Sequence, residues 1–355
     1  MEQQIKDAFT FVCRHASAPI RYRIEREIRN RPAEDPALAP LYAKLLTVPH
    51  VKKALACQRA DGFFGTVIHG CYYGGFDATV DWLKRHGVET SHPAMVRARD
   101  CLERWDGQEA DHFYKAGHAM DEHGRGGFDT LVARLLLDLE AEESLPQIGR
   151  EIERALASFR GAFSHRSVDD FSRRATFRGE ACRYYIKGAP FPDAAFIDLL
   201  QKTRSWRTAE NLDMVRRSYR HCEALMHDYD GGQIYINCGH FVGPFNHHWQ
   251  RQSPRIAPVS LRDFDADPIE FTWFMKGLSR RGTLLPLYTE APEPDRIGML
   301  ARLLAELPEG VTEKQLHYFK QHLALEPSWR KAESVACDLY FPILLELSRC
   351  GIKME

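Results

Sequence analysis

The sequence predicts an all-α fold built from helical hairpins. Apolar residues recur at helical spacing along most of the chain, and no set of strands with alternating polarity stands out. In addition, one short glycine-centred motif recurs between the helices. Its best copy is Gln58–Phe64, at the end of an amphipathic segment. A repeat with a long period predicts architecture, because each unit buries its apolar face against the next one.

Each helical element has its own support. Apolar side chains step by three or four residues in four segments, so each set lies on one helix face. These sets are Met95, Ala98, Leu102 and Trp105; Ile148, Ile152, Ala155 and Phe159; Leu212, Val215, Tyr219, Cys222 and Leu225; and Ile297, Leu300, Leu304 and Leu307. Thr208 and Asp193 are predicted N-caps, and Gly87 is a predicted C-terminal glycine.

The helices form two alternating sets. Poorer copies of the motif are centred on Gly107, Gly161, Gly231 and Gly310. The helices that follow these turns are more apolar, and they are Phe76–His86, Phe128–Leu139, Ile269–Leu278 and Val335–Leu347. Two-helix units of this kind stack or close so that one helix faces outward and its partner faces inward. We therefore expect about five or six hairpins.

No low-complexity linker interrupts this pattern. We expect one domain over 1–355, with an N-terminal helical segment at 1–48 and hairpin repeats at 49–355. The net charge of −1 gives no long-range attraction to nucleic acid or to an anionic membrane. No apolar run is long enough to span a bilayer. Nine cysteines without a CxxC pair predict reduced thiols in a cytoplasmic protein. The oligomeric state is left open.

Gln58-x-x-Asp61-Gly62-x-Phe64 resembles the QW-type motif of squalene–hopene cyclases and of the wider terpenoid cyclase/protein prenyltransferase superfamily, in which the last residue is Trp. The stretch from Pro19 to Pro36 is similar to the start of bacterial proteins labelled prenyltransferase and squalene oxidase repeat. This resemblance implies an (α/α) toroid with a central cavity.

The family's chemistry does not follow from the resemblance. The acid motif D-x-D-D of class II cyclases has only a near match at Asp263–Ala266, and D-D-x-x-D is missing. The repeat motif itself is expected to brace the fold: glycine permits the turn, the glutamine amide bonds groups at helix ends, and the aromatic ring packs on a neighbour.

A first candidate site follows the second hairpin turn. His112, His118, Asp121 and His123 lie between an outer and an inner helix, at the expected mouth of the ring. Histidine and carboxylate together can act as general acid and base near neutral pH. The alternative interpretation is a solvated polar loop.

A second candidate site is a Cys/His cluster at Cys238, His240, His247 and His248. Cysteine and histidine are ligands that zinc prefers, but the spacing matches no standard finger. The alternative is a loop that lines a pocket, together with Phe241, Asn246 and Trp249.

Other polar and aromatic residues are candidates for ligand binding. They are His69, Tyr72, Tyr73, Asp77, Asp129, Tyr184 and Tyr185. Asp77 and Asp129 could instead bond the first-turn amides of their helices. Glu180 and Arg183 are expected to pair along a helix. Cys182 is a candidate nucleophile with no identifiable histidine partner.

Three functional hypotheses remain open. The first is a protein that binds a small, largely apolar molecule in a His- and aromatic-lined cavity, as an enzyme using His/Asp acid–base groups or as a relative of one. The second is a non-catalytic helical-repeat scaffold for a protein or peptide. The third is a carbohydrate-active α/α toroid, which would need two carboxylates across a groove.

Overall fold

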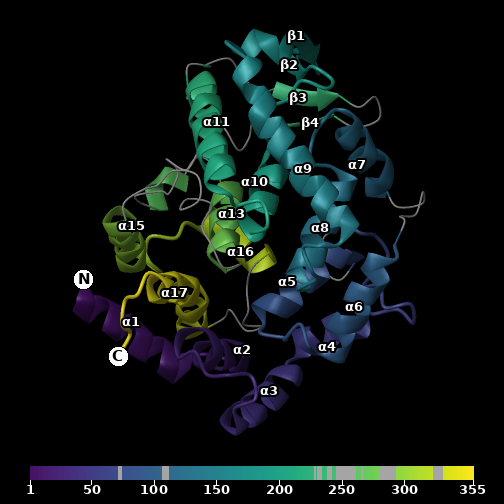
Figure 1. Cartoon of the computed structure of the whole chain (residues 1–355). Coiled ribbons are helices and arrows are strands. Elements are labelled where there is room, and N and C mark those ends of the chain that lie inside the picture. The colour runs from purple at the N-terminus through teal and green to yellow at the C-terminus, as the bar shows by residue number, and fades with distance from the viewer. Residues whose placement is uncertain are drawn as a thin grey trace.

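The computed structural model describes residues 1–70, 74–105, 112–227, 229, 234–237, 242–244, 261–264, 268–279, 293–322 and 331–355. In this part the chain is mainly helical, as predicted, and it also contains one small sheet. Figure 1 shows the helices running from α1, past the sheet at the top, and back to α17 near α1. None of the described helices is both long and apolar enough to cross a bilayer.

The α-helices and strands follow in chain order. They are α1 (Glu2–His15), α2 (Ala18–Arg23), α3 (Ala39–Leu46), α4 (Pro49–Ala56), α5 (Phe76–Arg85), α6 (Pro93–Glu103), α7 (His112–Glu122), α8 (Phe128–Asp138), α9 (Pro146–Gly161), β1 (Ser172–Phe177), β2 (Glu180–Tyr185), α10 (Ala194–Lys202), α11 (Ala209–His227), β3 (Ile234–Asn237), β4 (Val242–Pro244), α13 (Pro268–Ser279), α15 (Glu293–Glu306), α16 (Glu313–His322) and α17 (Ala332–Arg349).

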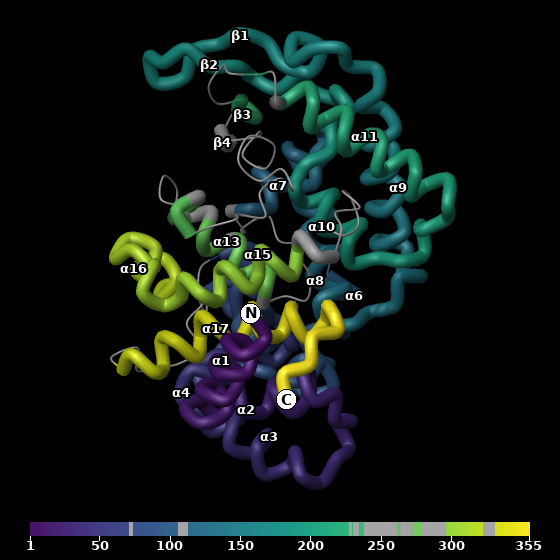
Figure 2. Tube along the Cα trace, turned by 90° about the vertical axis from the view of Figure 1, so that its left-hand side faces the viewer, coloured from purple at the N-terminus to yellow at the C-terminus, as the bar shows by residue number. Residues whose placement is uncertain are grey.

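The described residues form two hydrophobic cores. The larger one draws its residues from Tyr22 to Ile236, and the smaller one combines α1 and α2 with α13, α15, α16 and α17. Helix α17 packs on α1, so the two ends of the chain share one core, and Figure 2 shows both termini close together. The predicted N-terminal segment therefore divides: its first 28 residues supply Ile5 and Ile28 to the smaller core, whereas Leu38 and Leu45 join the larger one.

Part of the predicted alternation of helices is present in the larger core, although α10 was not among the predicted apolar helices and α7 lies between α6 and α8 in the chain. Helices α5, α8 and α10 contact one another in series, and most side chains of α5 and α8 are buried. Each also contacts a more exposed helix that precedes it in the chain: α4 for α5, α6 for α8, and α9 for α10. The predicted N-caps are confirmed, because Asp193 accepts a hydrogen bond from Phe196 N and Thr208 accepts one from Asn211 N.

The best copy of the motif braces the end of α4 against α6. The Gln58 side-chain amide donates to the carbonyl oxygens of Gly62 (2.9 Å) and Ala94 (2.7 Å), and its oxygen accepts from Arg97. Gly62 has a φ of +94°, which glycine adopts without strain. The other described copies do not share this turn, because neither Gly161 nor Gly310 has a positive φ. Gly107 and Gly231 lie outside the described residues.

Replacing Gly62 by Ala is expected to destabilise the fold by about 1–3 kcal/mol. The new Cβ would overlap the carbonyl oxygen of Arg97, and the backbone would stay in a left-handed conformation. Gly149 in α9 is a matched control, because a Cβ there meets nothing within 4 Å and alanine is the better helix former. Urea denaturation should show Gly149→Ala unchanged or more stable, and equal effects of the two changes would contradict the bracing role.

The small sheet is the main departure from the all-α prediction. Its strand order is β1-β2-β3-β4, with β1–β2 and β3–β4 antiparallel and β2–β3 parallel. The β1–β2 turn is formed by Arg178 (φ 53°) and Gly179 (φ 87°), and two such residues suit a tight hairpin. The expectation that Glu180 and Arg183 pair on a helix is therefore wrong, because both lie in β2 and Arg183 pairs with Asp169 instead.

Candidate functional site

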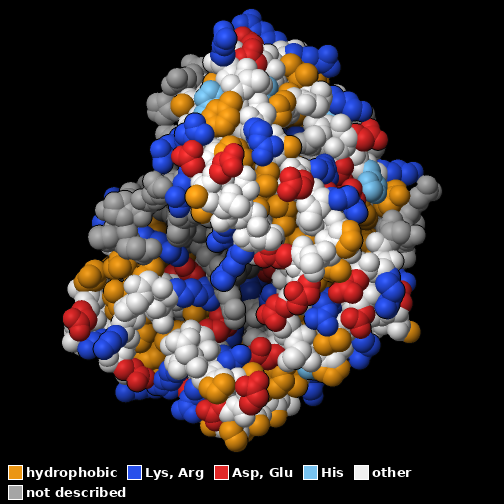
Figure 3. Space-filling view, viewed as in Figure 1, with side chains coloured by type: hydrophobic (Ala, Val, Ile, Leu, Met, Phe, Trp, Pro, Cys, Tyr) orange, Lys and Arg blue, Asp and Glu red, His pale blue; other side chains and the backbone are white. Residues whose placement is uncertain are grey.

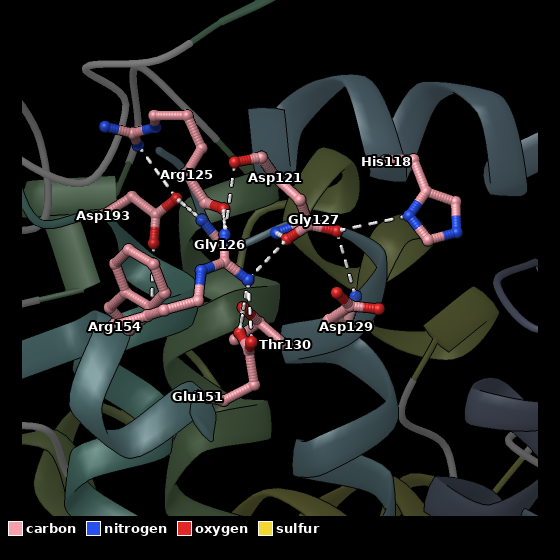
Figure 4. A network of polar contacts seen from close by, with 11 residues as sticks. His118, Asp121, Arg125, Gly126, Gly127, Asp129, Thr130, Glu151, Arg154 and Asp193 are labelled. Carbon is pink, nitrogen blue, oxygen red and sulfur yellow. Dashed lines mark hydrogen bonds and ion pairs between the residues drawn. The ribbon is translucent and has the colours of Figure 1, made fainter. Parts of the chain in front are cut away.

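A polar junction forms where α7 crosses the start of α8 (Figure 4). The helices approach at backbone distance, because a Cβ on Gly127 would overlap the carbonyl oxygen of Gly117. A Cβ on Gly117 would in turn lie 2.7 Å from the Cβ of Phe128. Glycines at both positions therefore allow α7 to place His118 and Asp121 beside the first turn of α8. We call His118, Asp121 and Asp129 the α7 junction.

Asp121 is the centre of the α7 junction. Its Oδ1 accepts a hydrogen bond from Gly127 N, and its Oδ2 accepts one from Asp129 N, both at 3.1 Å. The carboxylate thus binds free amides at the N-terminus of α8, where the helix dipole favours negative charge. Arg154 from α9 donates to Oδ1 at 3.1 Å. The Asp121 side chain is only 10% exposed, so solvent screens these interactions weakly.

A second layer of polar contacts holds the junction in place. Arg154 also binds the carboxylate of Glu151, at 2.7 and 2.8 Å, and Glu151 accepts the hydroxyl of Thr130 from α8. The guanidinium further donates to the carbonyl oxygens of Asp121 and Arg125. Because these groups come from the α7–α8 turn, α8 and α9, the orientation of Asp121 depends on the packing of all three.

The position of Asp121 alters its protonation. The pKa of Asp121 is raised to about 7, mainly by burial and also by the nearby carboxylates of Asp129 and Glu151. The hydrogen bond from Asp129 N and the charge of Arg154 act in the opposite direction. Although burial opposes it, the carboxylates of Glu151 and Asp121 raise the pKa of Arg154, so this side chain stays charged. Asp121 is thus a carboxyl group that can gain or lose a proton near neutral pH.

His118 faces Asp121 without bonding to it directly. Its Nδ1 lies 3.9 Å from Asp121 Oδ2, which is too long for a hydrogen bond. Its Nε2 is buried and has no hydrogen-bond partner among the described residues. The ring packs against Phe128 (centroids 4.5 Å apart) and Tyr114 (4.4 Å). The 3.9 Å gap is therefore suited to a bridging polar atom of a ligand or a water.

The α7 junction has the ligand types of a cation site, but its charge environment opposes one. His118, Asp121 and Asp129 offer atoms that lie within 4.8 Å of one another. However, the Arg154 guanidinium is 3.1 Å from one Asp121 oxygen and would repel a divalent ion at close range. The junction therefore favours a proton or a neutral polar group over a metal.

A second His–Asp pair lies at the start of α5. His69 Nδ1 is 2.6 Å from Asp77 Oδ2, and Asp77 Oδ1 accepts from Gly70 N and Ala78 N. The first-turn alternative predicted for Asp77 is thus observed together with its pairing to His69. The His69 ring packs at 4.8 Å on Phe113, which belongs to α7. Helix α7 consequently contacts both His–Asp pairs.

Aromatic rings connect the starts of α5 and α8. Phe63 lies 4.8 Å from Phe76 and 5.2 Å from Trp105, and Trp105 lies 5.5 Å from Phe128. Tyr114 adds an edge-on contact to Phe128 at 5.2 Å. The series ends at His118, so a polar junction adjoins a mostly apolar, aromatic layer.

The remaining predicted residues lie elsewhere or outside the described part. His123 bonds the carbonyl of Ala119 through Nδ1. Tyr185 is buried, with the Arg125 guanidinium 4.9 Å from its ring centre, and Tyr184 lies on β2. Outside the described residues lie Tyr72, Tyr73, Cys238, His240, Phe241, Asn246, His247, His248, Trp249 and the side chain of His112. The zinc site expected at the Cys/His cluster therefore stays a prediction.

Sequence reasoning did not identify a charged cluster between the two cores. Arg23, Arg85 and Glu346 are at most 3% exposed, and the cluster also includes Glu27 and Asp81. Arg23 bonds Glu27 and the carbonyl of Arg85, and Lys276 from α13 lies 3.2 Å from Asp81. In the view of Figure 3 the molecule is hollowed near its centre, with both basic and acidic side chains at the edge of the hollow. The local signals among the described residues were the i,i+4 pairs Arg23–Glu27 and Asp81–Arg85 and the i,i+3 pair Glu346–Arg349.

Comparison of the chain with family models, with curated proteins and with solved structures finds no match. The fold and the α7 junction define a mainly helical protein in which a largely buried carboxyl group, Asp121, lies beside a histidine and aromatic side chains.

Proposed function

We propose that this protein binds a small, largely apolar molecule at the α7 junction and acts on it by proton transfer. The observation that carries the proposal is Asp121: a buried carboxyl with a pKa of about 7, facing His118 at 3.9 Å. Groups with such perturbed pKa values concentrate at functional sites. Trp105, Phe113 and Tyr114, the partly buried rings next to the core, would contact the apolar part of the molecule.

The two side chains would have different roles. Asp121 can exchange a proton with a ligand because its pKa lies near the working pH, where general acid–base catalysis is most efficient. His118 would bind a polar atom of the ligand through Nδ1, which lies 3.9 Å from Asp121 Oδ2. Arg154 would hold the Asp121 carboxylate in place after it loses its proton.

The terpenoid cyclase-like toroid belongs to this proposal. The series α5, α8 and α10, with α4, α6 and α9 beside it, supports an α/α arrangement over residues 49–202. In such a ring Asp121 would replace the missing D-x-D-D acid as proton donor. The cysteines of the described residues form no disulfide with one another, which supports the expected cytoplasmic location.

A thermal-shift experiment tests ligand binding. A prenyl diphosphate, a sterol-like lipid and an oligosaccharide are each added to the purified chain, and a ligand at about 100 times its Kd should stabilise it by about 2.7 kcal/mol. We expect one of the two apolar classes to raise the melting temperature. His118→Ala should remove most of that shift, and His317→Ala should leave it, because His317 is exposed on α16.

The outcomes separate the alternatives. A ligand that shifts wild type and His118→Ala equally would place binding outside the α7 junction. A shift only with the oligosaccharide would favour the carbohydrate hypothesis. No shift with any class would remove the support for a small-molecule site.

A further inference from the structure

The hairpin β1–β2 carries basic side chains that the α7 junction does not use. Residues 171–188 contain five Lys and Arg against one acidic residue, Glu180, in a chain whose net charge is −1. The hairpin lies at the top of the molecule in Figures 1 and 2. Arg173, Arg174 and Arg178 are exposed, and none of them has an ion-pair partner in the described part of the chain. A cluster of exposed, unpaired cations attracts a polyanion.

Aromatic side chains share one face of the sheet. Successive side chains of a strand point to opposite faces. The register Arg173↔Tyr184 and Tyr184↔Tyr235 therefore puts these three side chains on the same face, together with Phe177. The Phe177 and Tyr235 rings lie 4.9 Å apart, and the Arg178 guanidinium lies 5.1 Å from the Phe177 ring centre.

The other face of the sheet belongs to the core. Tyr185, Ile234 and Ile236 are buried there, at most 4% exposed. On the aromatic face, Phe177, Tyr184 and Tyr235 are only partly buried. This face thus combines aromatic rings that have accessible surface with arginines at its edge.

We propose that this sheet face binds single-stranded nucleic acid. Arg173, on this face, and Arg178, in the β1–β2 turn, would contact backbone phosphates, and unpaired bases would stack on Tyr184 and Tyr235. Arg174 lies on the opposite face, because it pairs with Arg183. Rings that lie in strands suit base stacking better than membrane insertion, because insertion needs protruding apolar side chains. Within 171–188, Ile186 is the single large apolar residue that is exposed, at 37%. The balanced charge of the whole chain conceals this local excess.

Fluorescence anisotropy with a labelled oligo(dT) of about 20 nucleotides tests the proposal, with oligo(U) and a DNA duplex of equal length in parallel. Two phosphate contacts predict that log K falls with log salt concentration with a slope of about −1.4 for a single strand. Arg173→Gln should reduce the slope by about 0.7. Tyr184→Ala should weaken binding about tenfold. Circular dichroism reports whether each variant is folded.

Arg14→Gln is the matched control, because Arg14 is an exposed arginine on α1, far along the chain. It should bind like wild type. Equal binding of duplex and single strand, or an unchanged affinity of folded Tyr184→Ala, would overturn the stacking model. Binding to anionic phospholipid vesicles without binding to either oligonucleotide would assign the patch to a membrane surface instead.

Discussion

Replacing Asp193 by Ala is expected to lower the free energy of unfolding by about 3–5 kcal/mol, the range for breaking a buried ion pair from one side. Asp193 Oδ2 accepts from Arg125 at 3.0 Å and from Gly126 N at 2.9 Å, and Oδ1 caps α10. The Arg125 side chain is 2% exposed and would keep its charge without this carboxylate. Urea denaturation followed by circular dichroism measures the loss.

Two variants make this result interpretable. Asp169→Ala removes the partner of Arg183, but Asp169 is 75% exposed, so its loss should change stability by at most about 1 kcal/mol. Asp193→Asn retains an oxygen for the cap and should fall between wild type and Asp193→Ala. A loss below about 1 kcal/mol for Asp193→Ala would mean that water enters and solvates Arg125, and that this pair contributes little to the stability of the turn.

Asp121→Asn is expected to change how stability depends on pH. The pKa of Asp121 is about 7 in the folded chain and near its usual value of 3.8 when unfolded. Between these values the folded state holds a proton that the unfolded state has released, so the free energy of unfolding of the wild type falls as pH rises. About three pKa units correspond to about 4 kcal/mol.

The quantity to measure is the difference in free energy of unfolding between variant and wild type at each pH, because the contributions of all other titrating groups cancel in it. Between about pH 4 and about pH 8 the stability of Asp121→Asn relative to wild type should increase by about 4 kcal/mol, and above this range it should stay constant. Asp170→Asn is the control: backbone hydrogen bonds from Arg166 and Ser167 lower the pKa of Asp170, so its difference should stay flat over this range. A flat difference for Asp121→Asn would show that Asp121 is ionised throughout and would remove the basis of the proton-transfer proposal.

Much of the helical part could be predicted from the sequence. Helices α5, α8, α13 and α17 lie where the apolar segments were expected, within a few residues at each end. The caps at Asp193 and Thr208 were also predictable. These features depend on residues a few positions apart, and the 3.6-residue spacing of apolar side chains is visible in the sequence itself.

The sheet could not be predicted in the same way. Its hairpin depends on a left-handed conformation at Arg178, which few non-glycine residues adopt, and β2 pairs with β3 about fifty residues later in the chain. Strand preference depends on the surface onto which the strand packs, so Glu180–Tyr185 has no clear local signature.

The candidate site shows the same division. The sequence alone identified His118 and Asp121 as polar residues of a segment between two helices and Asp129 as a residue of the next helix, and it determined the helical class of the fold. That the segment is itself a helix, α7, was not predicted. Only the tertiary structure decided that Arg154, Glu151 and Asp193 surround them, that α1 packs on α17, and that Asp121 is buried enough to titrate near pH 7. The physical reason is that helix formation depends on residues close together in the chain, whereas burial and charge pairing bring together side chains that are distant in the chain.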